Sequence, residues 1–201
     1  MNRELSLKDD KQIRIDFAHA LEEHRRAIDS VLEQSQQIER AVEEIVTAIE
    51  AGGKVIWLGN GGSAADAQHM AAELMVRYAK NRRPLASIAL TTDSSILTAH
   101  SNDYEFETVF ARQIEGLASP DDVVIAMSTS GKSANVVKAI EAAKLKGCFT
   151  IVMTGRSDSP SGALSDICFQ VDTVETARAQ EAHSLISHLI CEGLDSVYAT
   201  E

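Results

Sequence analysis

The sequence predicts a doubly wound α/β fold with a parallel sheet, preceded by a helical hairpin. After Gly53, short apolar runs alternate with longer stretches of helical periodicity. The runs are apolar throughout, as in strands that are buried on both faces of a parallel sheet. Before Gly52 the chain has helical periodicity and no strand-like run. These three observations together favour a helical hairpin followed by a parallel α/β core.

The hairpin is predicted within residues 11–51, where apolar side chains recur at three- and four-residue steps. The first apolar stripe comprises Ile13, Phe17, Leu21, Ile28, Val31 and Leu32, and the second, after Ser35, comprises Ile38, Val42, Ile45, Val46 and Ile49. Gly52 and Gly53 end the second helix, because the residue after a helix often needs a positive φ. We expect this hairpin to serve packing or subunit assembly.

Residues 53–201 are expected to form the α/β core. The predicted strands are residues 55–58, 86–90, 123–127, 149–153 and 167–171, and the predicted helices are residues 63–80, 104–117, 133–146 and 177–198. Right-handed crossovers would place helices on both faces of this five-stranded sheet, in a three-layer sandwich. No linker or repeat divides the chain, so residues 1–201 are predicted to form a single domain, with residues 1–52 as its hairpin.

The composition excludes several classes of function. The chain has 201 residues and a net charge of −11, from 19 Lys and Arg against 30 Asp and Glu. Such an acidic chain lacks the basic patch of a nucleic-acid-binding protein and is not attracted to an anionic membrane face. No apolar run approaches the roughly 18 residues of a membrane span, and the first residues do not resemble a signal peptide. Three widely spaced cysteines, Cys148, Cys168 and Cys191, favour reduced thiols in a cytoplasmic protein.

The loop after the first predicted strand is rich in glycine, and it reads Gly59, Asn60, Gly61, Gly62, Ser63. Glycines let backbone amides approach a ligand, and the N-terminus of the following helix is suited to a phosphate. Ser63 and Asp66 have the spacing of a capping box. The loop also matches the dinucleotide fingerprint G-x-G-x-x-A. The acidic residue expected about 20 positions later is missing, however, since Asp93 lies much farther on. We therefore favour a different phosphate ligand.

The loop after the third predicted strand carries hydroxyl groups, in the order Ser128, Thr129, Ser130, Gly131, Lys132, Ser133. Isolated hydroxyls often form local turns, but four within six residues predict a second anion site made of O–H and N–H donors. Ser133 is expected to be the N-cap of the next helix. The last three residues are those of an ATP-binding P-loop, but Ala126 replaces the first glycine of that motif, which excludes such a site.

Two helices carry candidate acid/base or metal-binding residues. His69 and Glu73 are four residues apart and therefore share one helix face, where they can bind one metal ion or act as a base and its orienting partner. The alternative is a solvated surface pair. The final helix carries Gln180, Glu181, His183 and His188. A helical rise of about 12 Å separates Gln180 from His188, so spacing alone does not choose between the two histidines.

In combination, these segments resemble the sugar isomerase (SIS) domain family, and within it the family of phosphoheptose isomerases. The matching runs are residues 59–69 (GNGGSAADAQH), 90–104 (LTTDSSILTAHSNDY), 128–133 (STSGKS) and 180–183 (QEAH). The resemblance covers nearly the whole chain and implies a flavodoxin-like SIS fold. It implies conversion of D-sedoheptulose 7-phosphate to D-glycero-D-manno-heptose 7-phosphate, for bacterial heptose and lipopolysaccharide synthesis. It also implies cytoplasmic homotetramers with active sites at subunit contacts.

The resemblance further implies roles for individual residues. One zinc ion per subunit would be held by His69, Glu73, Gln180 and His188, with Glu73 and His188 as the acid/base pair; His188 is thereby selected over His183. The substrate would be bound by Asn60, Gly61, Gly62, Ser63, Glu73, Asn102, Asp103, Ser128, Thr129, Ser130, Ser133 and Gln180. Asn102 and Asp103 have an alternative role as an N-cap before a helix. Some family members carry an acidic residue in place of Ala177, so contacts there are expected to differ.

The candidate residues suit an intramolecular oxidoreductase of the aldose–ketose type. A carboxylate can remove a proton from C1 of a ketose to form an enediol, and an imidazole can shuttle the other proton. Zinc would polarise the carbonyl or stabilise the enediolate oxygens, and the phosphate would serve as a remote binding handle. One rival is a non-catalytic SIS protein of the type that associates with the initiator DnaA, which lacks acid/base residues. Another is a sugar-phosphate sensor, which usually adds a basic DNA-binding module.

Overall fold

The computed structural model describes residues 13–156 and 158–200. Within these ranges the chain forms a parallel sheet with the strand order β2-β1-β3-β4-β5. The strands are β1 (Val55–Gly59), β2 (Ser87–Ala89), β3 (Val123–Met127), β4 (Phe149–Thr154) and β5 (Ile167–Gln170). All five predicted strands are confirmed, and the observed ends lie within one residue of the predicted ones.

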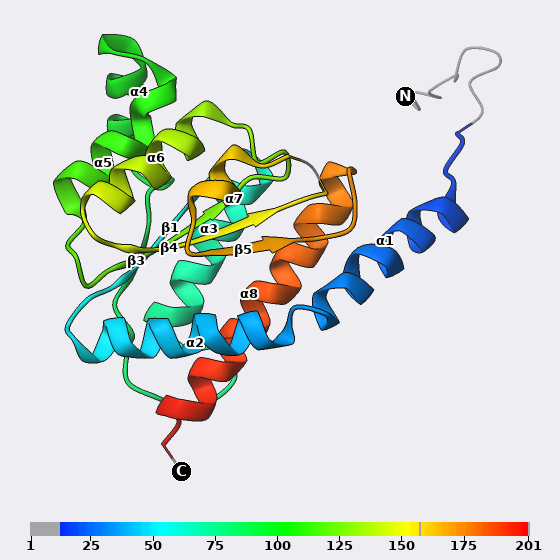
Figure 1. The fold of residues 1–201 in the computed structure, drawn as a ribbon, viewed down its shortest axis with the longest axis horizontal. Helices are drawn as coiled ribbons and strands as arrows, with labels where there is room; N and C mark the ends of the chain where they lie inside the picture. The colour runs from blue at the N-terminus through cyan, green and yellow to red at the C-terminus, as the bar shows by residue number, and fades with distance from the viewer. Residues whose placement is uncertain (1–12, 157, 201) are drawn as a thin grey trace, which may run out of the picture.

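Helices cover both faces of this sheet (Figure 1). They are α1 (Phe17–Leu32), α2 (Ser35–Glu50), α3 (Gly62–Met75), α4 (Ser94–Asp103), the 3-10 helix η1 (Phe106–Thr108), α5 (Val109–Leu117), α6 (Ala134–Leu145), α7 (Pro160–Leu164) and α8 (Thr176–Tyr198). Helices α2, α3 and α8 pack on one face of the sheet, and α5 and α6 pack on the other. The predicted three-layer, doubly wound architecture is therefore confirmed.

Alternate residues of each central strand enter two separate apolar cores. Trp57 of β1 packs with the core on the side of α2, α3 and α8, whereas Ile56 and Leu58 pack with the core beneath α5 and α6. All residues of β1 and β3 are buried. This burial on both faces explains why the strands are continuously apolar in the sequence.

The hairpin of α1 and α2 packs across α8, and its first helix presents apolar side chains to solvent. Gly52 follows α2 with a φ of 86°, as the predicted helix stop requires. In α1, Ala27 and Val31 are buried, but Phe17 is 69% and Leu32 is 79% exposed. Much of the predicted apolar stripe of α1 is thus uncovered within a single chain.

Four helical segments differ from the prediction. Helix α3 ends at Met75 rather than at residue 80, because Asp195 of α8 accepts hydrogen bonds from the backbone N–H groups of Ala79 and Lys80. The predicted helix 104–117 is η1 followed by α5. Helices α4 and α7 were not predicted. Helix α4 lacks an apolar periodicity because it buries none of its residues. Its N-cap is Asp93, whose side chain accepts a hydrogen bond from the Ile96 N–H.

Candidate active site

The glycine-rich loop leads from β1 into α3. Its Gly61 has a φ of 58° and is the N-cap of α3, which begins at Gly62. The predicted capping box is wrong, because the helix starts earlier than expected and Ser63 is buried inside its first turn. Asp66 instead accepts a hydrogen bond from the Ser184 hydroxyl at 3.3 Å. Burial raises the pKa of the Asp66 carboxyl, and this hydrogen bond opposes the rise.

The hydroxyl-rich loop leads from β3 into α6. The buried Ser128 donates a hydrogen bond from its hydroxyl to that of Ser133 at 3.2 Å. Ser130 accepts a hydrogen bond from the backbone N–H of Lys132 at 3.2 Å. Ser133 is the N-cap of α6 as predicted, although its side chain makes no capping hydrogen bond. The hydroxyl groups of Ser128 and Ser133 therefore point toward one another at the start of a helix.

The two loops are neighbours because β1 and β3 pair directly, with Gly59 beside Met127 at their carboxyl ends. This is the point where the strand order reverses, the usual ligand position in such sheets. The side chains of Asn60 and Asn135 exchange hydrogen bonds of 2.8 and 2.9 Å and so join the loop after β1 to α6.

A pocket of about 270 Å³ lies between the two loops. It is lined by Asn60, Gly61, Gly62, Ser63, Met127, Ser128, Thr129, Ser133, Thr176 and Gln180. Gln180 of α8 closes one side, and a Cβ atom on Gly62 would lie only 2.6 Å from its Nε2 atom. Eight of the residues predicted to bind substrate thus gather around one pocket. Thr176 was missed because a lone threonine in the first turn of a helix carries no distinctive signal.

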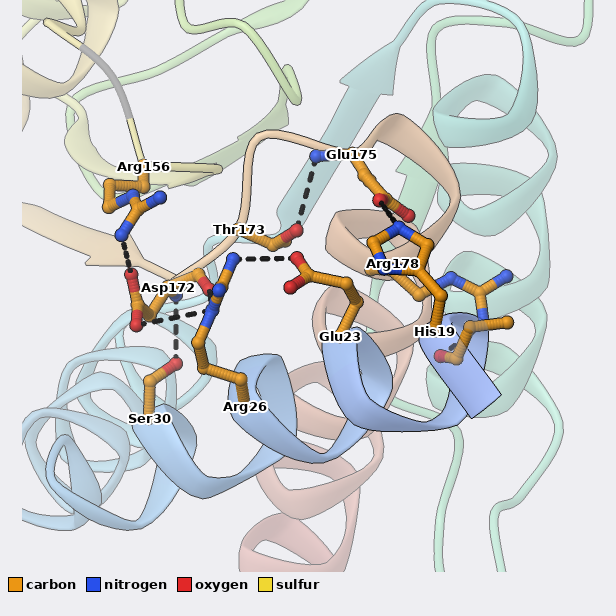
Figure 2. Close-up of polar contacts among 10 residues, drawn as sticks. His19, Glu23, Arg26, Ser30, Arg156, Asp172, Thr173, Glu175 and Arg178 are labelled. Atoms are coloured by element: carbon orange, nitrogen blue, oxygen red, sulfur yellow. Dashed lines mark hydrogen bonds and ion pairs between the residues drawn. The ribbon is translucent and has the colours of Figure 1, made fainter. Parts of the chain in front are cut away.

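The start of α8, which carries Thr176 and Gln180, is fixed by polar contacts with α1 (Figure 2). Arg26 of α1 donates a hydrogen bond from Nε to the carbonyl of Asp172 at 3.0 Å. Arg156 contacts the Asp172 carboxylate at 3.0 Å. His19 of α1 lies 2.7 Å from the carboxylate of Glu175, the N-cap of α8. The hairpin therefore holds the loop that leads into one wall of the pocket.

The acid/base candidates form a second group, on the facing surfaces of α3 and α8. His69 Nε2 and Glu73 Oε1 are 3.0 Å apart, which confirms that the two side chains share one helix face. The ring of His188 meets that of His69 edge to face, with centroids 5.2 Å apart. The same His188 ring also stacks on Tyr78, which follows α3, with centroids 5.6 Å apart. Tyr78 was not predicted, because it lies in an irregular segment with no motif.

The four residues expected to bind zinc have suitable donor atoms, but only three of them lie close together. Two imidazoles, a carboxylate and an amide oxygen are donors that zinc accepts. His69, Glu73 and His188 lie close together, whereas Gln180 lies in the pocket, two turns earlier on α8. In residues 13–156 and 158–200, no three His, Cys, Asp or Glu side chains are already arranged around a metal position. Zinc binding would therefore require at least one of these side chains to reorient.

Four of the predicted substrate-binding residues do not line the pocket of the single chain: Glu73, which belongs to the acid/base group, and Asn102, Asp103 and Ser130. Asn102 and Asp103 are exposed at the end of α4, where the Asn102 amide donates a hydrogen bond to the Asp103 carboxylate at 2.8 Å. Their alternative role as an N-cap is wrong, because α4 ends with them. Ser130 belongs to the hydroxyl-rich loop but is outside the pocket lining. Their contact with substrate stays a prediction.

His183 occupies a different environment from His188. Its side chain is fully buried, and within the described part of the chain neither ring nitrogen has a hydrogen-bond partner. Burial lowers the pKa of the His183 imidazole to about 4, and the nearby backbone of Thr154 opposes this shift. His183 is thus a neutral core residue, away from the contact that His188 makes with His69.

We expect this burial to make the protein less stable in weak acid. Because the imidazole pKa falls from 6.5 to about 4 on folding, only the unfolded chain takes up a proton between these values. The free energy of unfolding should therefore drop by about 2 kcal/mol between about pH 7.5 and about pH 5. Urea unfolding at the two pH values measures this, with His183→Leu as the comparison. An equal drop in His183→Leu would assign the acid sensitivity to other groups.

Comparisons with known proteins agree with this architecture. The SIS domain family model matches residues 19–155. The phosphoheptose isomerase of Aquifex aeolicus is 51% identical over 158 residues, which cover 79% of this chain and 83% of that relative. The probable phosphoheptose isomerase of Thermoplasma volcanium is 45% identical over 183 residues, or 91% of each chain.

Solved structures give the same result. The phosphoheptose isomerase from Neisseria gonorrhoeae superposes with a TM-score of 0.82 at 39% identity, over 89% of this chain and 96% of that one. The one from Francisella tularensis superposes with a TM-score of 0.81 at 32% identity, over 89% and 95% of the two chains. The chain therefore belongs to the SIS domain family and, within it, to the phosphoheptose isomerases.

Proposed function

We propose that this protein isomerises D-sedoheptulose 7-phosphate to D-glycero-D-manno-heptose 7-phosphate through an enediol. The observation that carries the proposal is that helices α3 and α8 each contribute both to the pocket and to the acid/base group. Helix α3 begins at the glycine-rich loop and carries His69 and Glu73, and helix α8 carries Gln180 in the pocket and His188 beyond it. The non-catalytic alternative has no comparable support, because the acid/base candidates are retained and lie close together.

The pocket between the loops would bind the phosphate group. Ser128, Thr129 and Ser133 offer hydroxyl donors, and the first turns of α3 and α6 offer free N–H groups and partial positive charge. Such local dipoles bind an anion at close range even in a chain with a net charge of −11. Binding energy from this distant end of the sugar would then position the reacting carbons.

Glu73 and His188 would move the protons of the isomerisation. The Glu73 carboxylate takes a proton from C1 of the ketose while a ring N–H group of His188 donates one to the carbonyl oxygen at C2, which leaves the enediol. Return of a proton to C2, with loss of the hydroxyl proton at C1, gives the aldose. His69, Glu73, Gln180 and His188 would hold a zinc ion, which when bound supplies Lewis-acid polarisation of the sugar oxygens.

We propose that the working form is a homotetramer whose active sites include residues from neighbouring subunits. Two features of the single chain support assembly. The apolar side chains of α1 are exposed, Phe17 by 69% and Leu21 by 53%, and Asn102 and Asp103, which are predicted to contact substrate, do not line the pocket of the single chain. Light scattering should give the mass of four chains, and a monomer that is fully active would contradict the proposal.

We also propose a cytoplasmic location and a supply of heptose for lipopolysaccharide and related glycans. None of the helices in the described ranges has the length and apolar character needed to span a bilayer. Cys148, Cys168 and Cys191 are all free thiols, which suits a reducing compartment. Unchanged heptose in the glycans of a strain that lacks this protein would contradict the assignment.

The function is tested by an NMR or coupled assay with D-sedoheptulose 7-phosphate, with added zinc and with a chelator. We expect turnover in the presence of zinc, and a lower rate after chelation that zinc restores. Sedoheptulose without phosphate is the matched control, and it should react far more slowly because the binding handle is missing. Failure to convert the phosphorylated ketose at any zinc concentration would reject the proposed function.

A further inference from the structure

The segment between α3 and β2 contacts both members of the acid/base pair. We propose that Tyr78 in this segment is a positioning residue for His188, and that the buried ion pair of Arg82 and Asp195 holds Tyr78 and the end of α3 in place. The inference rests on the proposed roles of Glu73 and His188. It concerns how two side chains from different helices keep one relative orientation.

The ring of Tyr78 fixes the plane of the His188 imidazole. The two rings are nearly parallel, with an interplanar angle of 22° and centroids 5.6 Å apart. His69 approaches the same imidazole at an angle of 75°, with centroids 5.2 Å apart. His188 is therefore in ring contact with both residues, and rotation of its side chain would break the stack on Tyr78. A general acid must hold its orientation in this way to reach the reacting oxygen.

The ion pair joins this segment to α8. Arg82 Nε donates a hydrogen bond to Asp195 Oδ1 at 2.9 Å, and the two side chains are only 0% and 2% exposed. The other carboxylate oxygen of Asp195 accepts hydrogen bonds from the N–H groups of Ala79 and Lys80 at 2.9 and 2.8 Å. Asp195 thus binds the two residues that directly follow Tyr78, and it does so from the helix that carries His188.

Arg82 also binds the last turn of α3. Its Nη2 donates a hydrogen bond to the carbonyl of Glu73 at 2.7 Å, and its Nη1 donates one to the carbonyl of Leu74 at 2.8 Å. Carbonyls at the end of a helix lack partners in the helix itself, so this guanidinium satisfies them. A single buried ion pair therefore holds the backbone of Glu73 and the segment that presents Tyr78 to His188.

The ring of Tyr78, rather than its hydroxyl group, makes the contact. The hydroxyl has no hydrogen-bond partner in the part of the chain that the structure describes. Burial, followed by the charge of Glu192, raises the pKa of the Tyr78 hydroxyl, so the phenol stays neutral near pH 7 and supplies no charge. Phenylalanine should therefore replace tyrosine at this position, whereas an aliphatic side chain should not.

The test compares Tyr78→Leu with Tyr78→Phe. We expect Tyr78→Leu to lower kcat by about 10- to 100-fold with KM almost unchanged, because the phosphate pocket is intact while the imidazole is misplaced. Tyr78→Phe should keep the wild-type kcat. Tyr198→Leu is the matched control, since Tyr198 packs at the edge of the same core and lies on α8, but contacts Arg83 and Glu50 instead of His188. It should leave both constants unchanged.

A second measurement does not depend on turnover. In the metal-free protein, the ring-proton NMR signals of His188, assigned by their loss in His188→Gln, should shift in Tyr78→Leu and stay nearly in place in Tyr78→Phe. If wild-type protein proves inactive, the proposed function fails, yet these signals still test the stack. A wild-type kcat in Tyr78→Leu, an equal loss in Tyr78→Phe or Tyr198→Leu, or a rise in KM alone would overturn the inference. Unshifted His188 signals in Tyr78→Leu would do the same.

Discussion

Glu73→Gln should lower kcat for D-sedoheptulose 7-phosphate by about 10²- to 10⁴-fold, the usual contribution of a general base. The amide keeps the size of the side chain and can still contact His69, but it cannot accept the proton from C1. Because the phosphate pocket lies at the other end of α3, KM should change little. Steady-state kinetics with the phosphorylated ketose measures both constants.

This variant should fold as the wild type does. The Glu73 side chain is 21% exposed, and the only hydrogen bond of its carboxylate within the described residues is the one to His69. Loss of one such contact costs at most about 1 kcal/mol. Glu115→Gln, the same change at an exposed position on α5, is the matched control and should keep full activity. Undiminished turnover in Glu73→Gln would remove Glu73 from the mechanism.

The sequence predicted the sheet well because strands that are buried on both faces are recognisable as continuous apolar runs. Every strand between two helical layers must be apolar at consecutive positions, and the observed ends of β3 match the predicted ones. The two loops could also be predicted, since glycine and hydroxyl residues at a strand end have few structural uses. That the loops meet at one pocket follows from the direct pairing of β1 with β3, which the sequence does not show.

The sequence could not separate His183 from His188, but the helix geometry does. Five residues along a helix correspond to a rotation of about 140°, so the two side chains leave α8 in different directions. His183 enters the core, while His188 meets His69 and Tyr78. Nothing in the residue types of α8 encodes which direction faces α3, because that depends on how the helices pack.

Helix α4 and the apolar stripe of α1 show where the sequence pattern fails to predict the structure of a single chain. Helix α4 buries no residue within one chain, so the apolar periodicity that reveals other helices is missing. In α1 the periodicity is present, yet Phe17, Leu21 and Leu32 remain exposed. An apolar periodicity therefore shows that one face of a helix is apolar. It does not show which surface covers that face.

Asp195→Ala should lower the free energy of unfolding by about 3–5 kcal/mol, the usual cost of breaking a buried ion pair from one side. The change leaves Arg82 buried without its carboxylate and leaves the N–H groups of Ala79 and Lys80 without an acceptor. Urea unfolding near pH 7 measures the loss. Glu105→Ala is the matched control, because its partner Lys138 is partly exposed and such pairs contribute about 1 kcal/mol or less.

The same pair should respond to acid. Burial alone would raise the pKa of the Asp195 carboxyl, but hydrogen bonds from Lys80 and Ala79 and the charge of Arg82 lower it below its ordinary value of 3.8. The stabilisation is therefore complete above that value and is lost only as the pH falls below it, so it is fully present near neutral pH. Replacing both partners with leucine should recover part of the loss in Asp195→Ala, since no unpaired charge remains buried, although the N–H groups of Ala79 and Lys80 still lack their acceptor. A loss in Asp195→Ala no larger than in Glu105→Ala would show that this ion pair does not hold the segment after α3.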